Sequence, residues 1–182
     1  ATFGGYFLLR RNWANVDKLA KRAVEQTDTT AIMSDGWYLR ARQAHYQDDI
    51  ASAAECYNKS DLARGGDERG YLPAKFGAAQ LRISNGDFDG AKFRLEKIVS
   101  QSRSPEAMTL LGILHAEDVF TAQANGNKED KSTERRKAIA LLEQVRAAWR
   151  DPKKKLSPDA AVLLNLARLY ENEAHDKSLA CL

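Results

Sequence analysis

The chain has 182 residues, of which 43% are hydrophobic and 29% charged, and its 28 basic and 25 acidic residues leave a net charge of only +3. This composition is ordinary for a soluble folded protein, and the interleaved charges give no reason to expect nucleic-acid binding from charge alone. Two widely separated cysteines argue against a disulfide scaffold and suit a reducing compartment, and no apolar run reaches the ~18–20 residues of a membrane span. The chain begins without Met and ends inside an apolar helical pattern, so we expect a segment of a longer protein.

Helical periodicity runs along the whole chain. In the first segment, Val16, Leu19, Ala20 and Ala23 recur at the spacing of one helix face, and similar patterns return in every later segment. No segment alternates polar and apolar residues as a half-buried strand does. The sequence therefore predicts an all-α fold.

The spacing of small residues indicates a repeat. Ala79 follows Ala41 by 38 residues, and Gly112 follows Ala79 by 33. Ala91 follows Ala53 by 38 residues as well. A helix-turn-helix unit of about 34 residues is typical of the tetratricopeptide repeat (TPR), whose helix pairs stack into a right-handed α-solenoid. We expect one such solenoid, divided into residues 1–29 (partial repeat one), 33–66 (repeat two), 72–104 (repeat three), 105–151 (repeat four) and 157–182 (an incomplete repeat five).

In each predicted pair, a small residue allows two helices to approach and a large residue one turn later fills the adjoining space. The predicted packing residues are Trp37, Ala41, Ala53, Tyr57, Ala79, Ala91, Leu95, Leu111, Gly112, Ala138, Leu142, Ala167 and Tyr170. Ser104-Pro105 and Ser157-Pro158 are both typical helix starts, with Ser as the N-cap and Pro in the first turn. Repeat four is too long for its class, and we assign the excess to an exposed loop over residues 118–132.

The segment around Gly90 also resembles a calcium-binding EF-hand loop. Asn85, Asp87 and Asp89 alternate before this glycine, and Glu96 follows six residues after it. The turn between two helices of a repeat explains more of the same residues. Related turns precede Val16 and Ala53, so we interpret the segment as a repeat turn and predict no metal site.

Other isolated features have ordinary explanations. His45, His115 and His175 lie in different helix pairs, and no convergence of metal ligands or catalytic groups is predicted. The glycine-rich segment 65–70 lacks the flanking strand and lysine of a phosphate loop and is expected to be a linker. Lys153, Lys154 and Lys155 form a basic run for which contact with nucleic acid or a histone remains a hypothesis. We therefore expect no enzyme and no cofactor.

The first helices of stacked pairs line the concave face of a solenoid, which is where such folds bind polypeptides. Positions beside the packing residues on these helices therefore form the predicted partner-binding groove. They are Asp35, Tyr38, Arg42, His45, Tyr46, Phe76, Gln80, Ile83, Thr109, Ile113, Glu117, Leu164, Arg168 and Glu171. Exposed aromatic and Arg side chains in this set are the types enriched at binding hot spots.

Three segments, 6–23, 76–91 and 106–116, resemble the TPR scaffold subunit of the RNA polymerase II-associated factor (PAF) complex. The Phe76, Gly77 and Gln80 element followed by Gly86-Asp87 is the most specific part, whereas Ala79 and Arg82 stand where the family has Gly and Tyr. The resemblance implies a nuclear, non-enzymatic scaffold that organises partner subunits for transcription elongation and histone modification. An unrelated TPR adaptor, such as a chaperone co-factor, is the alternative.

Overall fold

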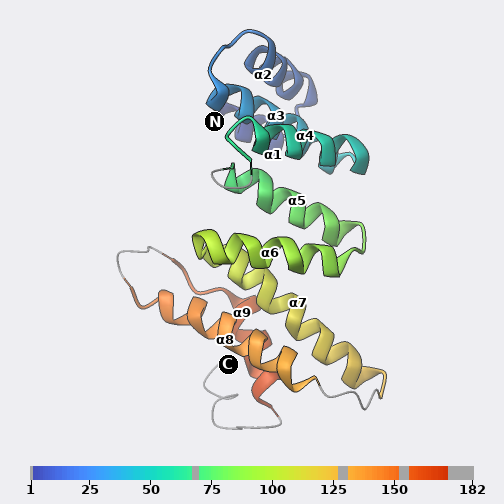
Figure 1. The fold of residues 1–182 in the computed structure, drawn as a ribbon, viewed down its shortest axis with the longest axis vertical. Coiled ribbons are helices and arrows are strands. Elements are labelled where there is room, and N and C mark those ends of the chain that lie inside the picture. The colour runs from blue at the N-terminus through green and yellow to red at the C-terminus, as the bar shows by residue number, and fades with distance from the viewer. Residues whose placement is uncertain (1, 67–69, 127–130, 152–155, 172–182) are drawn as a thin grey trace. The chain divides into compact units, whose positions relative to one another are not determined.

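The computed structural model describes residues 2–66, 70–126, 131–151 and 156–171, which form nine α-helices and contain no strand. The predicted all-α class is therefore confirmed, and short turns join α1 to α2, α3 to α4 and α5 to α6 (Figure 1). The helices are α1 (Thr2–Leu9), α2 (Trp13–Glu25), α3 (Thr30–Tyr46), α4 (Ile50–Leu62), α5 (Leu72–Ser84), α6 (Phe88–Ser102), α7 (Pro105–Ala124), α8 (Ser132–Ala148) and α9 (Ala160–Tyr170). They divide into two compact units, residues 1–94 and 95–182, and α6 begins in the first and ends in the second.

The same turn closes each helix pair of the first unit. A residue with positive φ precedes the second helix: 51° at Arg11, 57° at Asp48 and 76° at Gly86. The next residue caps that helix by accepting a backbone N–H three positions on: Asn12 from Asn15 at 3.3 Å, Asp49 from Ser52 at 3.1 Å, and Asp87 from Gly90 at 3.0 Å. Such caps stabilise a helix start by about 1 kcal/mol, so these polar residues fix where the chain turns.

Helices α2 and α3 pack through Gly36, which the sequence analysis did not single out. A Cβ added there would lie 2.8 Å from the Ala23 Cβ and 3.0 Å from the Ala20 carbonyl oxygen. Val16 and Ala20 of α2 are fully buried. The core continues through α3, α4 and α5 around Tyr57, which is 1% exposed. Small residues thus set the helix spacing and one large ring fills it.

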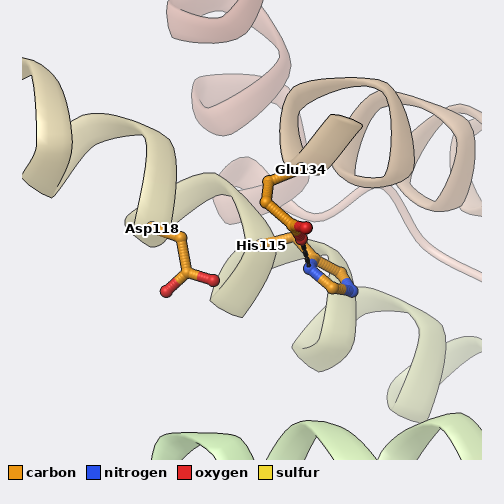
Figure 2. A group of neighbouring side chains, drawn as sticks. All are labelled: His115, Asp118 and Glu134. Carbon is orange, nitrogen blue, oxygen red and sulfur yellow. Dashed lines mark ion pairs between the residues drawn. The ribbon is translucent and has the colours of Figure 1, made fainter. Parts of the chain in front are cut away.

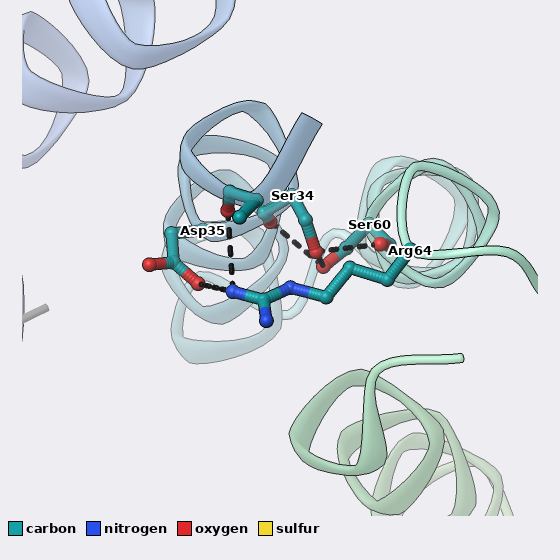
Figure 3. Close-up of polar contacts among 5 residues, drawn as sticks. Ser34, Asp35, Ser60 and Arg64 are labelled. Carbon is teal, nitrogen blue, oxygen red and sulfur yellow. Dashed lines mark hydrogen bonds and ion pairs between the residues drawn. The ribbon is translucent and has the colours of Figure 1, made fainter. Parts of the chain in front are cut away.

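The α3–α4 crossing contains a buried polar pair, Ser34 and Ser60, both fully buried (Figure 3). The Ser34 hydroxyl donates to the Ser60 carbonyl at 2.7 Å, and the Ser60 hydroxyl donates to the Ser34 carbonyl at 2.8 Å. Every hydroxyl proton therefore has an acceptor, which is what burial of a polar group requires.

The second unit has a larger apolar core, built by α7, α8 and α9 around Val119, Leu142 and Leu166. Ser104 caps α7 by accepting from the Ala107 N–H at 3.3 Å, with Pro105 in the first turn, as predicted. The equivalent prediction for Ser157-Pro158 is wrong, because α9 starts at Ala160 and Asp159 caps it through the Ala161 N–H.

The predicted loop over residues 118–132 is also wrong in its first half. Helix α7 continues to Ala124, and Val119, Phe120 and Ala122 are buried. These apolar residues extend the buried face of α7 beyond Ala116 by two further turns, and α8 does not begin until Ser132. Flanking polar residues concealed this apolar face in the sequence.

The predicted packing residues are all buried except Trp37, which is partly exposed. Its ring lies under two cations, with Arg40 at 5.2 Å and Lys59 at 4.6 Å from the ring centroid. A Cβ on Gly112 would lie 2.8 Å from Leu142 Cδ2, so these two predicted residues meet at the α7–α8 crossing. Among the described helices, none combines the length and the apolar character needed to cross a membrane.

Candidate functional site

A hollow of about 380 Å³ opens between α3 and α5 in the first unit. Its lining is polar and mixed in charge, and comprises Arg42, His45, Tyr46, Asp48, Gln80 and Ser84. Four of these, Arg42, His45, Tyr46 and Gln80, belong to the predicted groove. Asp48 lies in the α3–α4 turn and Ser84 is the last residue of α5, so both lie beyond the packing positions from which the sequence predicts the groove. We call this feature the α3–α5 hollow.

A chain of hydrogen bonds through His45 joins three helices beneath the hollow. Ser84 of α5 donates its hydroxyl proton to the Gln80 carbonyl at 3.2 Å, so its oxygen accepts from His45 Nε2 at 3.3 Å. His45 Nδ1 is then the acceptor for the Tyr57 hydroxyl of α4, at 3.2 Å. The contacts thereby select the Nε2–H tautomer of a neutral imidazole.

Electrostatics also favour neutral His45. Burial lowers the pKa of the imidazole, the nearby Arg42 guanidinium lowers it further, and Asp48 opposes both, which leaves it below its ordinary value. Burial likewise raises the pKa of Tyr57 to about 12, so its phenol remains a hydrogen-bond donor. The base of the hollow is therefore uncharged at neutral pH.

Arg42 supplies the positive charge of the hollow. Its guanidinium donates to the Tyr46 hydroxyl at 3.1 Å and stacks 5.1 Å from the centroid of the same ring. Burial lowers the pKa of Arg42, but the surrounding phenols outweigh burial and leave the pKa above its ordinary value. Within the described part of the chain Arg42 forms no salt bridge, whereas Asp48 contributes a carboxylate at the rim.

Asp35 and Tyr38 were predicted in the groove but are engaged inside the unit. Asp35 accepts from Arg64, in the turn after α4, at 3.1 Å, and Arg64 also donates to the Ala31 carbonyl at 3.3 Å (Figure 3). The half-buried Tyr38 ring lies against Tyr57 and Tyr71, with centroids 6.1 and 5.6 Å away. These two residues hold α3, α4 and α5 together.

The remaining predicted groove residues fall outside the α3–α5 hollow. Phe76 and Ile83 are half-buried on α5. In the second unit Glu117 and Arg168 face each other at 4.0 Å, and the Arg168 guanidinium lies 3.6 Å from the Phe120 ring centroid. Thr109 and Ile113 are half-buried, whereas Leu164 and Glu171 are exposed.

The carboxylates of the EF-hand-like segment have other partners. Asp87 caps α6 and pairs with Arg82, and Asp89 pairs with Lys92 at 3.0 Å. The interpretation of this segment as a repeat turn is therefore supported by its contacts. His115 lies beside Asp118 and Glu134, a convergence that the sequence analysis did not predict. His175 and the run Lys153–Lys155 lie outside the described residues.

Comparison with known proteins supports the helical-repeat class. The chain is 29% identical over 178 residues to "Tetratricopeptide repeat protein 1" of Schizosaccharomyces pombe. The match covers 97% of this chain but only 16% of that protein, so the chain corresponds to a small part of its relative. No family model matches the chain.

Proposed function

We propose that the chain is a segment of a non-enzymatic scaffold whose α3–α5 hollow binds a polypeptide segment of a partner protein. The observation that carries the proposal is the convergence of Arg42, Tyr46 and Gln80 from two first helices on one open hollow. Arg and Tyr dominate binding hot spots because they combine contact area with hydrogen bonding. A helical-repeat fold related to a TPR protein supports a protein partner over a small substrate.

The chemistry of the hollow favours an acidic side chain on the partner. Arg42 offers a half-buried guanidinium without a carboxylate partner among the described residues, and Gln80 offers an amide. Partial burial strengthens a guanidinium–carboxylate contact, and the planar fork of Arg binds both oxygens together. Asp48 at the rim repels a second acidic group, which restricts the register of an extended or helical partner segment.

The finer assignment is to a transcription complex. Resemblance of segments 6–23, 76–91 and 106–116 to the PAF-complex scaffold supports a nuclear protein that organises elongation-complex subunits and promotes histone modification. The Gly86-Asp87 pair of this resemblance forms the α5–α6 turn, and Gln80 lines the hollow. The matching residues therefore include both a structural and a surface position.

A chaperone-type adaptor is the second candidate, because one feature of the hollow also fits it. Arg42 and Gln80 would donate hydrogen bonds to the free carboxylate at the end of a partner chain. An internal acidic side chain and a terminal carboxylate share this chemistry. The identity of the bound partner separates the two candidates.

Co-purification of the full-length protein tests the proposal. We expect wild type to recover transcription elongation subunits and the double variant Arg42→Ala, Tyr46→Ala to lose at least one of them. Arg22→Ala, which removes an exposed charge from α2, is the matched control and should retain them all. Recovery of chaperones without elongation subunits would favour the adaptor and exclude the PAF-type assignment.

A further inference from the structure

His115, Asp118 and Glu134 converge between α7 and α8 in the second unit (Figure 2). His115 and Asp118 lie one turn apart on α7, and Glu134 stands in the first turn of α8. One ligand atom from each residue can be chosen such that all three atoms lie within 4.8 Å of one another. Two elements separated by a connection of several residues thus bring three metal-binding side chains together.

His115 is buried, and its Nδ1 nitrogen has no aligned hydrogen-bond partner among the described residues. Its side chain is 4% exposed, and Glu134 Oε2 lies 2.6 Å from Nδ1 but outside the alignment of a hydrogen bond. A buried polar atom without an aligned partner calls for an explanation, since such atoms are rare in folded proteins. A cation bound to the ring nitrogen and to the carboxylates would satisfy Nδ1, with the Glu134 oxygen moving outward from its 2.6 Å contact to make room.

We propose that His115, Asp118 and Glu134 form a binding site for a divalent transition-metal ion of the Zn²⁺ type. One imidazole and two carboxylates are a donor set that Zn²⁺ accepts, with water completing its coordination. The imidazole disfavours Ca²⁺ and Mg²⁺, which take oxygen ligands. Asp118 is half-buried, and one of its carboxylate oxygens already lies within 4.8 Å of a ligand atom from each of the other two residues.

The surroundings of Glu134 leave one oxygen for the metal. Lys137 lies 3.6 Å from Oε1, whereas Oε2 faces the histidine. Bound metal would join α7 to α8 near their connection and add a link that the TPR-type packing of the crossing does not require.

Metal binding by the purified 182-residue chain tests the proposal. Titration of the metal-free chain with Zn²⁺ in a calorimeter should give one ion per chain and raise the melting temperature by several degrees. Co²⁺, used as a coloured probe, should show the visible absorption of a cation with a nitrogen ligand. Absence of Zn²⁺ binding by the wild-type chain would overturn the proposal.

Variants assign the binding to this cluster. Asp118→Asn and Glu134→Gln keep the side-chain volumes, and each should weaken Zn²⁺ binding about tenfold or more. Glu117→Gln is the matched control, because Glu117 is an exposed carboxylate on the same helix that faces Arg168 instead. His45→Gln controls for binding at the other described histidine. Unchanged Zn²⁺ affinity in both Asp118→Asn and Glu134→Gln would place any bound ion elsewhere and refute the site.

Discussion

Ser34 and Ser60 exchange hydrogen bonds across the α3–α4 crossing, each hydroxyl donating to the backbone carbonyl of the other residue. The two hydroxyl oxygens lie 3.3 Å apart, so the pair forms a compact buried network. Two serines 26 residues apart can adopt this arrangement in only one register of the two helices. The pair therefore specifies the crossing as well as stabilising it.

Removal of one member tests this role. Ser60→Ala deletes one of the reciprocal bonds and should lower the free energy of unfolding by about 1 kcal/mol. Ser60→Val adds volume to a fully buried position and should cost more, about 1–3 kcal/mol. Urea denaturation measures both. Ser100→Ala, which removes an exposed hydroxyl bonded within its own helix, should change stability by less than about 0.5 kcal/mol.

Replacement of glycine by alanine should have opposite effects on stability at two helical positions, Gly5 and Gly36. A Cβ at Gly5 of α1 meets no atom within 4 Å, so Gly5→Ala should stabilise by up to about 1 kcal/mol through helix propensity. At Gly36 the same Cβ would press on Ala23 and the Ala20 carbonyl, and backbone cannot move aside as a flexible side chain can. We expect a net loss for Gly36→Ala, since overpacking costs about 1–3 kcal/mol. Thermal melts of equal sign for the two variants would contradict this account.

At the α5–α6 turn, substitution of the capping residue Asp87 should lower stability more than substitution of the nearby Asp89. Asp87→Ala removes both the cap of α6 and the pair with Arg82, and should destabilise by about 1–2 kcal/mol. Asp89→Ala removes only an i,i+3 pair of an almost fully exposed carboxylate, so its effect should be near zero. Addition of Ca²⁺ should leave the melting temperature of wild type unchanged. A rise that Asp87→Ala abolishes would instead establish a calcium loop.

His45 predicts a dependence of stability on pH. Its folded pKa lies below the ordinary value of about 6.5, so the unfolded chain binds a proton more readily than the folded chain. The contribution of neutral His45 to the free energy of unfolding is therefore fully present above about pH 6.5. It declines as the pH falls towards the folded pKa. The urea midpoint should drop between pH 7.5 and 5.5.

The variant His45→Gln isolates this effect from other titrating groups. Arg42 and Asp48 face the ring from its own chain segment, Tyr57 from α4 and Ser84 from α5, and all are unchanged by the substitution. The variant should lose part of the decline in midpoint between the two pH values. An identical decline in wild type and variant would assign it to other groups.

The sequence predicted the helix crossings well, because close approach requires particular residues. Gly112 and Leu142 were named from spacing alone, and they meet at the α7–α8 crossing. The end of α7 was predicted less well from segment length and polarity, because the helix continues through Val119 and Phe120 into a segment whose composition is typical of a loop. Local pattern does not show how far a buried face extends.

The places where polar side chains from different helices meet were the hardest feature to predict from the sequence. The proximity of His115 to Glu134 depends on how α7 and α8 pair across their connection, and 19 positions of sequence separate the two residues. Asp35 and Tyr38 have the sequence pattern of surface residues but serve internal contacts, because Arg64 and Tyr71 reach them from other elements. A helix position predicts a face, whereas the neighbour on that face depends on the tertiary structure.

The central claim is that the α3–α5 hollow receives a partner polypeptide, and site-specific photo-crosslinking in the full-length protein tests it most directly. A photoreactive amino acid placed at Ser84, on the rim of the hollow, should crosslink to a subunit of a transcription elongation complex. The same probe at Lys18, an exposed position on α2, should not. The Arg42→Ala, Tyr46→Ala variant should suppress the Ser84 crosslink. Equal crosslinking from both positions, or none from Ser84 in a protein that still co-purifies with its partners, would contradict the claim.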